Sequence, residues 1–189
     1  MEQLLQLDKE LLVFLNGLGS KPFDPFWKII TKQVYWTPLF LAVFYLLKRK
    51  IGWRNLGIII LFLAVLITFT DQITNLFKNH FQRIRPCYDE EISGIIRVVK
   101  SSKTFSFFSG HAANSMASTM FIFLIIRKFY KHTYLLFCFP FVFAYSRIYL
   151  GLHFPGDIIT GYLFGAAFGF LCYKLYNYLL PKFNIIKHD

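Results

Sequence analysis

Apolar residues gather along this chain in long runs that short basic segments separate. The five longest runs occupy residues 34–47, 56–70, 116–126, 135–150 and 158–180. Several runs are shorter than the roughly 20 residues that a transmembrane helix needs, so we expect each helix to continue into its polar flanks. The pattern predicts an all-α fold, a polytopic membrane helical bundle of about five transmembrane helices within residues 26–181.

The first residues follow a different pattern. In residues 3–16 the leucines recur at helical spacing, and charged residues occupy the middle of the segment. Such an amphipathic helix carries too much charge to cross a bilayer easily, so we expect it to lie along the interface. Residues 17–25 are rich in Gly and Pro and break the helix. We expect one domain over residues 1–189, with a sixth membrane helix if this first one inserts.

Composition favours a membrane protein over a soluble one. Hydrophobic residues make up 56% of the chain and charged residues only 16%, whereas a soluble domain carries about 25% charged residues. The net charge of +11 would suit nucleic acid as a partner, but the apolar runs argue against it. We expect the bilayer and its anionic lipids to be the partners instead.

Basic residues also indicate an orientation. Residues 48–55 and 127–132 and the C-terminal tail fall on one side of the predicted bundle, and the positive-inside rule makes that side cytoplasmic. Residues 78–110 and 146–157 then share the opposite side, which is basic too and whose cations could bind a substrate. We expect an integral protein of a bacterial inner membrane, with its active site facing the periplasm or the exterior.

Three polar clusters fall on this predicted outer side. Taken in chain order, they are Lys78 with Arg85-Pro86, then Ser109-Gly110-His111, then Ser146-Arg147 with His153 and Asp157. Each residue alone has an ordinary role, the cations as membrane-edge anchors and Ser109 or Asp157 as a helix cap. Their ordered occurrence at one membrane edge favours a shared site.

The cations and the expected helix start suit a phosphate group. The planar guanidinium groups of Arg85 and Arg147 match phosphate oxygens, and Lys78 adds a point charge. Backbone N–H groups at Ser109 and Gly110, where a helix begins, provide a further anion site. Together these groups would also stabilise the charge of a phosphoryl-transfer transition state.

The two histidines suit covalent catalysis. His153 precedes Asp157 by four residues, within plausible reach of a hydrogen bond that would set the imidazole tautomer. The other ring nitrogen of His153 would then be free to attack phosphorus, and His111 could protonate the leaving oxygen. This reading predicts a two-step phosphoryl transfer that needs no metal and no cofactor.

The three clusters resemble the signature motifs of the type 2 phosphatidic acid phosphatase superfamily, K-x6-RP, PSGH and SR-x5-H-x3-D. The first and third motifs match completely, and the second departs only at Phe108, where the family usually has Pro. The resemblance implies that His153 forms a phosphohistidine, that Asp157 orients it and that His111 is the general acid. It assigns phosphate binding to Lys78, Arg85, Ser109, Gly110 and Arg147.

The same resemblance implies a lipid phosphate or pyrophosphate as substrate. The first choice is undecaprenyl pyrophosphate, followed by a lipid A phosphate and then by phosphatidylglycerol phosphate. Two other possibilities stay open: a relative that binds or flips lipids without turnover, and a transferase that passes the phosphate to another lipid. The sequence leaves the oligomeric state open.

Overall fold

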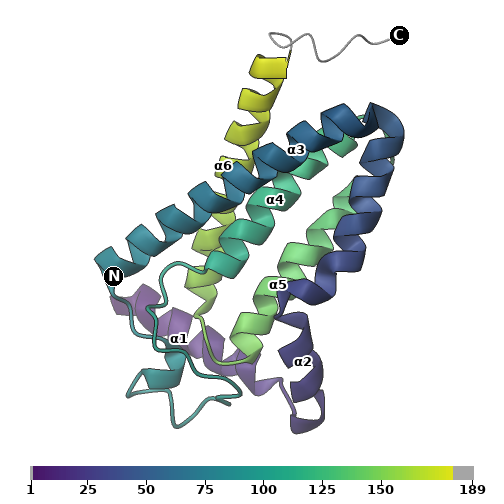
Figure 1. The fold of residues 1–189 in the computed structure, drawn as a ribbon. Coiled ribbons are helices and arrows are strands. Elements are labelled where there is room, and N and C mark those ends of the chain that lie inside the picture. Colours follow the sequence, from purple (N-terminus) through teal and green to yellow (C-terminus); the bar gives the residue numbers. More distant parts are fainter. Residues whose placement is uncertain (1, 181–189) are drawn as a thin grey trace.

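All regular elements in residues 2–180, which the computed structural model describes, are helices (Figure 1). The prediction of an all-α fold is therefore confirmed for this part of the chain, whereas the basic tail beyond residue 180 lies outside it. The α-helices are α1 (Glu2–Gly17), α2 (Asp24–Ile30), α3 (Thr37–Phe81), α4 (Gly110–Ile126), α5 (Cys138–Tyr149) and α6 (Pro155–Leu179), joined in part by short 3-10 turns at Lys21–Phe23, Gln33–Trp36, Pro86–Tyr88 and Thr133–Phe137.

Helix α3 contains the first two predicted spans without the loop that we expected between them. Residues 48–55 are helical apart from a sharp turn at Gly52, whose φ of 74° and ψ of 174° lie outside the helical region. Glycine suits this position because a positive φ costs it nothing. The two halves of α3 diverge from the turn like the arms of a V (Figure 1).

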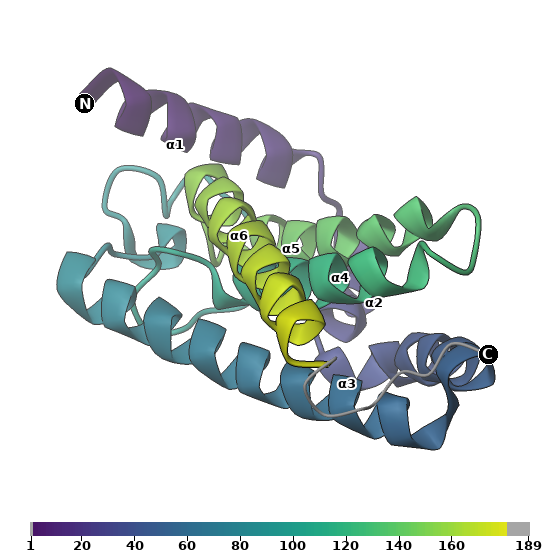
Figure 2. The same ribbon diagram turned by 90° about the horizontal axis from the view of Figure 1, so that it is seen from above.

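Helix α4 lies at the centre of the bundle and packs against α3, α5 and α6 (Figure 2). Its contact with α6 is especially close because Gly161, Gly165 and Gly169 form a small-residue stripe, which lets helices approach in lipid. A Cβ atom added at Gly165 would lie closer than 3.0 Å to the carbonyl oxygen of Ala113. This approach holds the two helices that carry the second and third motifs in register.

We expect Gly165→Ala to destabilise the folded protein by about 1–3 kcal/mol, since backbone at the contact cannot move aside as a flexible side chain would. The matched control is Gly57→Ala in α3, where a Cβ meets nothing within 4 Å and where Ala favours the helix. Thermal unfolding of both variants in detergent measures the difference. Equal unfolding temperatures would contradict this account of the α4–α6 contact.

The outer surface of the bundle is apolar. Two segments, Gln33–Tyr88 and Pro155–Leu179, are long and apolar enough to cross a membrane, with mean hydropathies of 2.2 and 1.5 in their most apolar windows. Only 28% and 22% of those windows is buried, and outward residues such as Leu61 and Leu163 are more than 60% exposed. Such faces suit lipid rather than water. The number of spans stays a prediction, since α4 has 17 residues and α5 only 12.

The two ends of the bundle differ in character. At one end the turn of α3 meets the segment after α4, where the hydroxyl of Tyr130 donates to the carbonyl oxygen of Leu46 at 3.2 Å. The two basic segments predicted to share a side therefore do so. At the other end, α1 lies across the bundle beside the connection from α3 to α4 (Figure 1).

Helix α1 is amphipathic, as predicted, and its charged side faces the bundle. Leu12 and Asn16 are fully buried against the bundle. The charged residues Asp8 and Lys9 also face the protein and form ion pairs there. The outward stripe is apolar and consists of Leu4, Leu7, Leu11, Phe14 and Leu18, each at least 40% exposed.

Candidate active site

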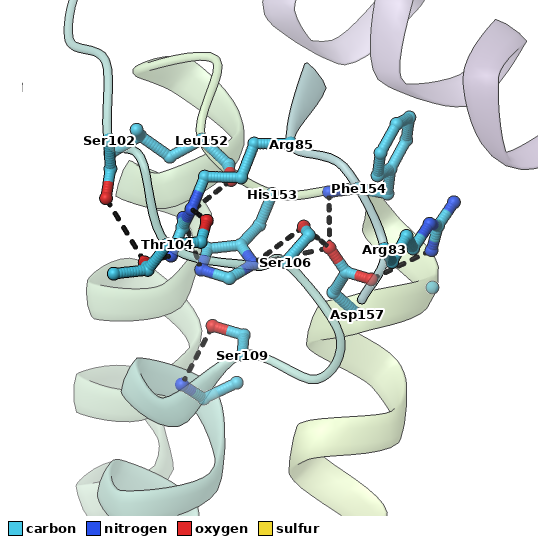
Figure 3. A network of polar contacts seen from close by, with 12 residues as sticks. Arg83, Arg85, Ser102, Thr104, Ser106, Ser109, Leu152, His153, Phe154 and Asp157 are labelled. Carbon is cyan, nitrogen blue, oxygen red and sulfur yellow. Dashed lines mark hydrogen bonds and ion pairs between the residues drawn. The ribbon is translucent and has the colours of Figure 1, made fainter. Parts of the chain in front are cut away.

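The three predicted clusters meet at the end of the bundle that α1 covers. Arg85 lies on the connection from α3 to α4, and His153 lies on the short connection from α5 to α6. They are 68 residues apart in sequence, yet Arg85 Nη1 is 3.0 Å from His153 Nε2 (Figure 3). The first and third motifs therefore form one site.

His153 is almost completely buried, and its protonation is set by its two neighbours. Its Nδ1 lies 3.2 Å from Asp157 Oδ2, which confirms the contact expected from their four-residue spacing. Its Nε2 is not free as expected, because it faces Arg85 Nη1. Since arginine can only donate, Nε2 must accept and the proton of the neutral ring resides on Nδ1. The ring is thus held in the tautomer whose lone pair is on Nε2, the nitrogen that can attack an electrophile.

The charge state of His153 follows from its surroundings. Burial, followed by the positive charges of Arg85, Arg147 and Lys78, lowers the pKa of the imidazole well below its usual 6.5. The ring therefore stays neutral at physiological pH. Neutral imidazole is the nucleophilic form.

Asp157 is fully buried in the first turn of α6 and accepts several hydrogen bonds. Its Oδ2 accepts from the backbone N–H of Phe154 at 3.0 Å and from the hydroxyl of Ser106 (Figure 3). Its Oδ1 accepts from Arg83 Nη1 at 2.8 Å. The contact with Phe154 also caps the start of α6. One carboxylate thus both begins a helix and orients the histidine.

The predicted phosphate-binding cations are held by neutral oxygen atoms. Arg85 donates to the carbonyl oxygen and hydroxyl of Thr104, at 2.7 and 2.9 Å, and to the carbonyl oxygen of Leu152 at 2.8 Å. Arg147 donates to the hydroxyl of Thr31 at 2.9 Å, and its buried Nε has no hydrogen-bond partner among residues 2–180. Lys78 interacts electrostatically with both arginines. Three buried or half-buried cations that form no ion pair with a carboxylate of residues 2–180 favour an anionic ligand.

The second motif begins α4, as predicted. Ser109 is the N-cap residue, and its hydroxyl accepts from the backbone N–H of Ala112 at 3.4 Å. Gly110 is the first residue of the helix, where a Cβ would already touch Thr74 at 3.4 Å. His111 stacks on Phe143 with 4.9 Å between ring centroids and interacts electrostatically with His153 and Arg147. All eight predicted residues therefore gather at one end of the bundle.

Phe108, at the position where the resemblance expects Pro, is fully buried. Its ring stacks on Phe164 of α6 at 5.0 Å and meets Phe77 of α3 edge-on at 5.2 Å. An aromatic cluster between two helices therefore fixes the approach of the chain to α4. The departure from the motif is accommodated by packing.

Sequence reasoning did not identify Arg83, Thr104, Ser106 and Thr31 as site residues. In the sequence, Arg83 is one of several basic residues after the second apolar run, and it lies outside the first motif. Thr31, Thr104 and Ser106 lie outside any periodic pattern, and no local signal marks them. Their contacts join residues 19 to 116 positions apart, so only the fold brings them to the site.

Comparison with known proteins gives relatives over nearly the whole chain. The family model described as the PAP2 superfamily matches residues 57–181. A curated lipid A 4'-phosphatase of Bacteroides thetaiotaomicron is 33% identical over 186 residues, which cover 96% of this chain and 82% of that protein. The lipid A 4'-phosphatase of Porphyromonas gingivalis is 30% identical over 182 residues, 94% of this chain and 76% of that protein.

Two solved structures share the fold. A PAP2 type phosphatidylglycerolphosphate phosphatase from Bacillus subtilis superposes with a TM-score of 0.72 at 17% identity, over 95% of this chain and 89% of that one. Aquifex aeolicus LpxE gives a TM-score of 0.66 at 23% identity, over 87% and 93% of the two chains. The resemblance seen in the motifs is thereby confirmed, and the chain belongs to the PAP2 superfamily as an integral membrane lipid phosphatase.

Proposed function

We propose that this protein removes a phosphate from lipid A, with His153 as the nucleophile. The geometry that carries the chemistry is the buried His153, oriented by Asp157 on one side and facing the cation Arg85 on the other. The choice of lipid A rests on the two curated relatives, both lipid A 4'-phosphatases that this chain matches almost end to end. They favour lipid A over undecaprenyl pyrophosphate, which was the first expectation, and over phosphatidylglycerol phosphate.

The first half of the reaction forms a phosphohistidine. Nε2 of His153 attacks phosphorus, and the bond from phosphorus to the ester oxygen breaks. His111, which gains a proton when the bound phosphate anion offsets the positive charges of Arg147 and Lys78, gives that proton to the ester oxygen, so that the lipid leaves as an alcohol. Because Arg85 Nη1 is 3.0 Å from Nε2, Arg85 must exchange this contact for a phosphate oxygen as the substrate binds.

The second half releases inorganic phosphate. Neutral His111 now takes a proton from water, whose oxygen attacks phosphorus as the bond to Nε2 breaks. His153 returns to its neutral form with the proton still on Nδ1, facing Asp157. Lys78, Arg85, Arg147 and the N–H groups at the start of α4 stabilise the phosphate charge in both steps.

A cavity next to His111 supports a lipid substrate. It has a volume of about 180 Å³ and lies between the two halves of α3, α4 and α5. Its walls are mainly apolar, with Val43, Leu63 and Ile122 among them, and it shares Phe143 with the stacked ring of His111. An acyl chain in this cavity would lead directly to a phosphate at the histidines.

We propose further that the site faces the periplasm of a bacterial inner membrane. The two basic segments at the turn of α3 and after α4 lie at the end opposite His153. The positive-inside rule assigns that end to the cytoplasm. The site and α1 would then lie at the outer surface, where lipid headgroups are exposed to water.

Purified protein in detergent with EDTA should release inorganic phosphate from lipid A. Release should be faster than from undecaprenyl pyrophosphate, phosphatidylglycerol phosphate or phosphatidic acid at equal concentration. Analysis of the lipid product by mass spectrometry would show which phosphate is lost. Preference for undecaprenyl pyrophosphate would overturn the substrate, labelled phosphate on a second lipid would indicate a transferase, and activity that EDTA abolishes would contradict the metal-free mechanism.

A further inference from the structure

We propose that Arg83 and Asp8 are positioning residues for the catalytic carboxylate, so that helix α1 is part of the active-site framework. This inference rests on the roles proposed above for His153 and Asp157. The relay runs from Asp8 on α1 through Arg83 to Asp157 on α6, and from there to His153.

Arg83 is committed to two carboxylates. Its Nη1 donates to Asp157 Oδ1 (Figure 3), and its Nη2 donates to Asp8 Oδ2, each at 2.8 Å. The guanidinium also lies over the ring of Phe154, with Cζ 3.9 Å from the ring centroid. Both ends of the fork are therefore occupied by carboxylates, which separates Arg83 from Arg85 and Arg147, whose hydrogen-bond partners are neutral groups. Arg83 serves the carboxylate rather than the phosphate.

Asp8 binds a second group in the site. Its Oδ1 accepts from the backbone N–H of Gly156 at 2.7 Å, in the first turn of α6. The fit is close, because a Cβ at Gly156 would lie 2.8 Å from Asp8 Oδ2. A carboxylate at this place also interacts favourably with the positive end of the α6 dipole. Asp8 therefore fixes both Arg83 and the start of the helix that carries Asp157.

Helix α1 is held firmly enough to fix Asp8. The Asn16 amide donates to the carbonyl oxygens of Ile148 and Tyr149 at 3.0 Å and accepts from the backbone N–H of Arg97 at 2.7 Å. Lys9 pairs with Glu91 at 2.7 Å. These contacts hold α1 against the end of α5 and against the connection from α3 to α4. The opposite face of α1 carries the outward apolar stripe and is left to the lipid.

A buried carboxylate requires such support. Asp157 has no exposed surface, and an ionised carboxylate away from water is costly unless it is paired and hydrogen-bonded. Among residues 2–180, Arg83 is the only arginine or lysine in an ion pair with it. Without this cation the charge on Asp157 and its hold on the Nδ1 proton of His153 would both weaken. The effect would fall on the chemical step, because neither Arg83 nor Asp8 touches the substrate.

The test compares kcat and KM of variants with lipid A as substrate. Arg83→Gln should lower kcat about 10- to 100-fold, which corresponds to losing one hydrogen bond to a buried charge. Arg83→Lys should restore part of that loss, because it keeps the charge. Asp8→Asn keeps an acceptor for Gly156 N–H and should lower kcat about three- to tenfold. In every case KM should change less than about twofold, since the substrate contacts are intact.

Glu10→Gln is the matched control, because it also removes one negative charge from α1. Glu10 is exposed, and its carboxylate accepts only from Gln6 among the hydrogen bonds of residues 2–180, so kcat should not change. Unfolding temperatures in detergent separate a lower kcat from a smaller folded fraction. His153→Ala in the same series tests the proposed function itself.

The outcomes distinguish the two proposals. If His153→Ala abolished turnover while Arg83→Gln and Asp8→Asn kept the wild-type kcat, the relay would be wrong and the proposed function would stand. A raised KM at unchanged kcat in Arg83→Gln would make Arg83 a phosphate ligand and also overturn the relay. Turnover by His153→Ala would overturn both proposals.

Discussion

His153→Ala should abolish phosphate release from lipid A, with a loss of at least about 10⁴-fold in kcat. The histidine is the only protein group in the proposed mechanism that forms a bond to phosphorus, and its neutral form is favoured by burial and by the surrounding cations. The cations Lys78, Arg85 and Arg147 remain in the variant, so substrate should still bind. Initial rates of phosphate release and equilibrium binding of the lipid measure the two properties separately.

The matched control for this variant is His80→Ala. His80 is exposed, lies one residue before Phe81 at the end of α3 and packs its ring on that neighbour at 5.0 Å. It is close to the first motif in sequence but outside it, and its removal should leave kcat unchanged. Substantial turnover by a folded His153→Ala variant would show that another group, or water directly, attacks phosphorus.

His111→Gln should lower kcat on lipid A about 10²- to 10⁴-fold, the usual contribution of a general acid. The alcohol that leaves from a lipid phosphate is a poor leaving group and needs the proton that His111 supplies. A phosphate ester of p-nitrophenol has a good leaving group, so the first step should then depend little on the variant. The ratio of the two losses, measured as single-turnover rates, therefore reports the role of His111 directly.

Equal losses on the two substrates would contradict acid catalysis by His111 and leave it a role in phosphate binding or packing against Phe143. His132→Gln is a suitable control, because His132 is exposed between α4 and α5, in the basic segment opposite the site. A burst of product followed by slow turnover in His111→Gln would show that the second step, where His111 acts as base, limits the rate.

The site shows how the proposed nucleophile, His153, can be buried and still be oriented for attack. Arg85 and Asp157 hold opposite sides of the His153 ring, so its orientation is set before any phosphate arrives. Preorganisation of this kind lowers the reorganisation needed in the transition state. The relay through Arg83 extends it to α1, a helix whose outer face is built for lipid.

Much of this arrangement could be predicted because it depends on residues that are close together in the sequence. Long apolar runs favour helices whatever elements pack against them, and the five predicted runs lie in helices. A four-residue spacing at a helix start brings His153 and Asp157 within reach wherever the helix lies. The capping role of Ser109 likewise depends only on the next three residues. Sequence alone therefore determined the fold class and the longest apolar helices, and it singled out the eight candidate residues, but it did not predict α2 or the continuity of α3.

The partners of those residues were decided by tertiary structure. The first motif selects Arg85, but nothing local predicts that Arg83, two positions earlier, faces Asp157 while Arg85 faces His153. The helical turn at Gly52 and the inward-facing, partly buried Asp8 were hidden for the same reason: helical periodicity shows which residues share a face, but not what that face meets. Long-range contacts decide the role of each cation by its position, because a buried charge is stable only where a counter-charge or several hydrogen-bonding groups surround it.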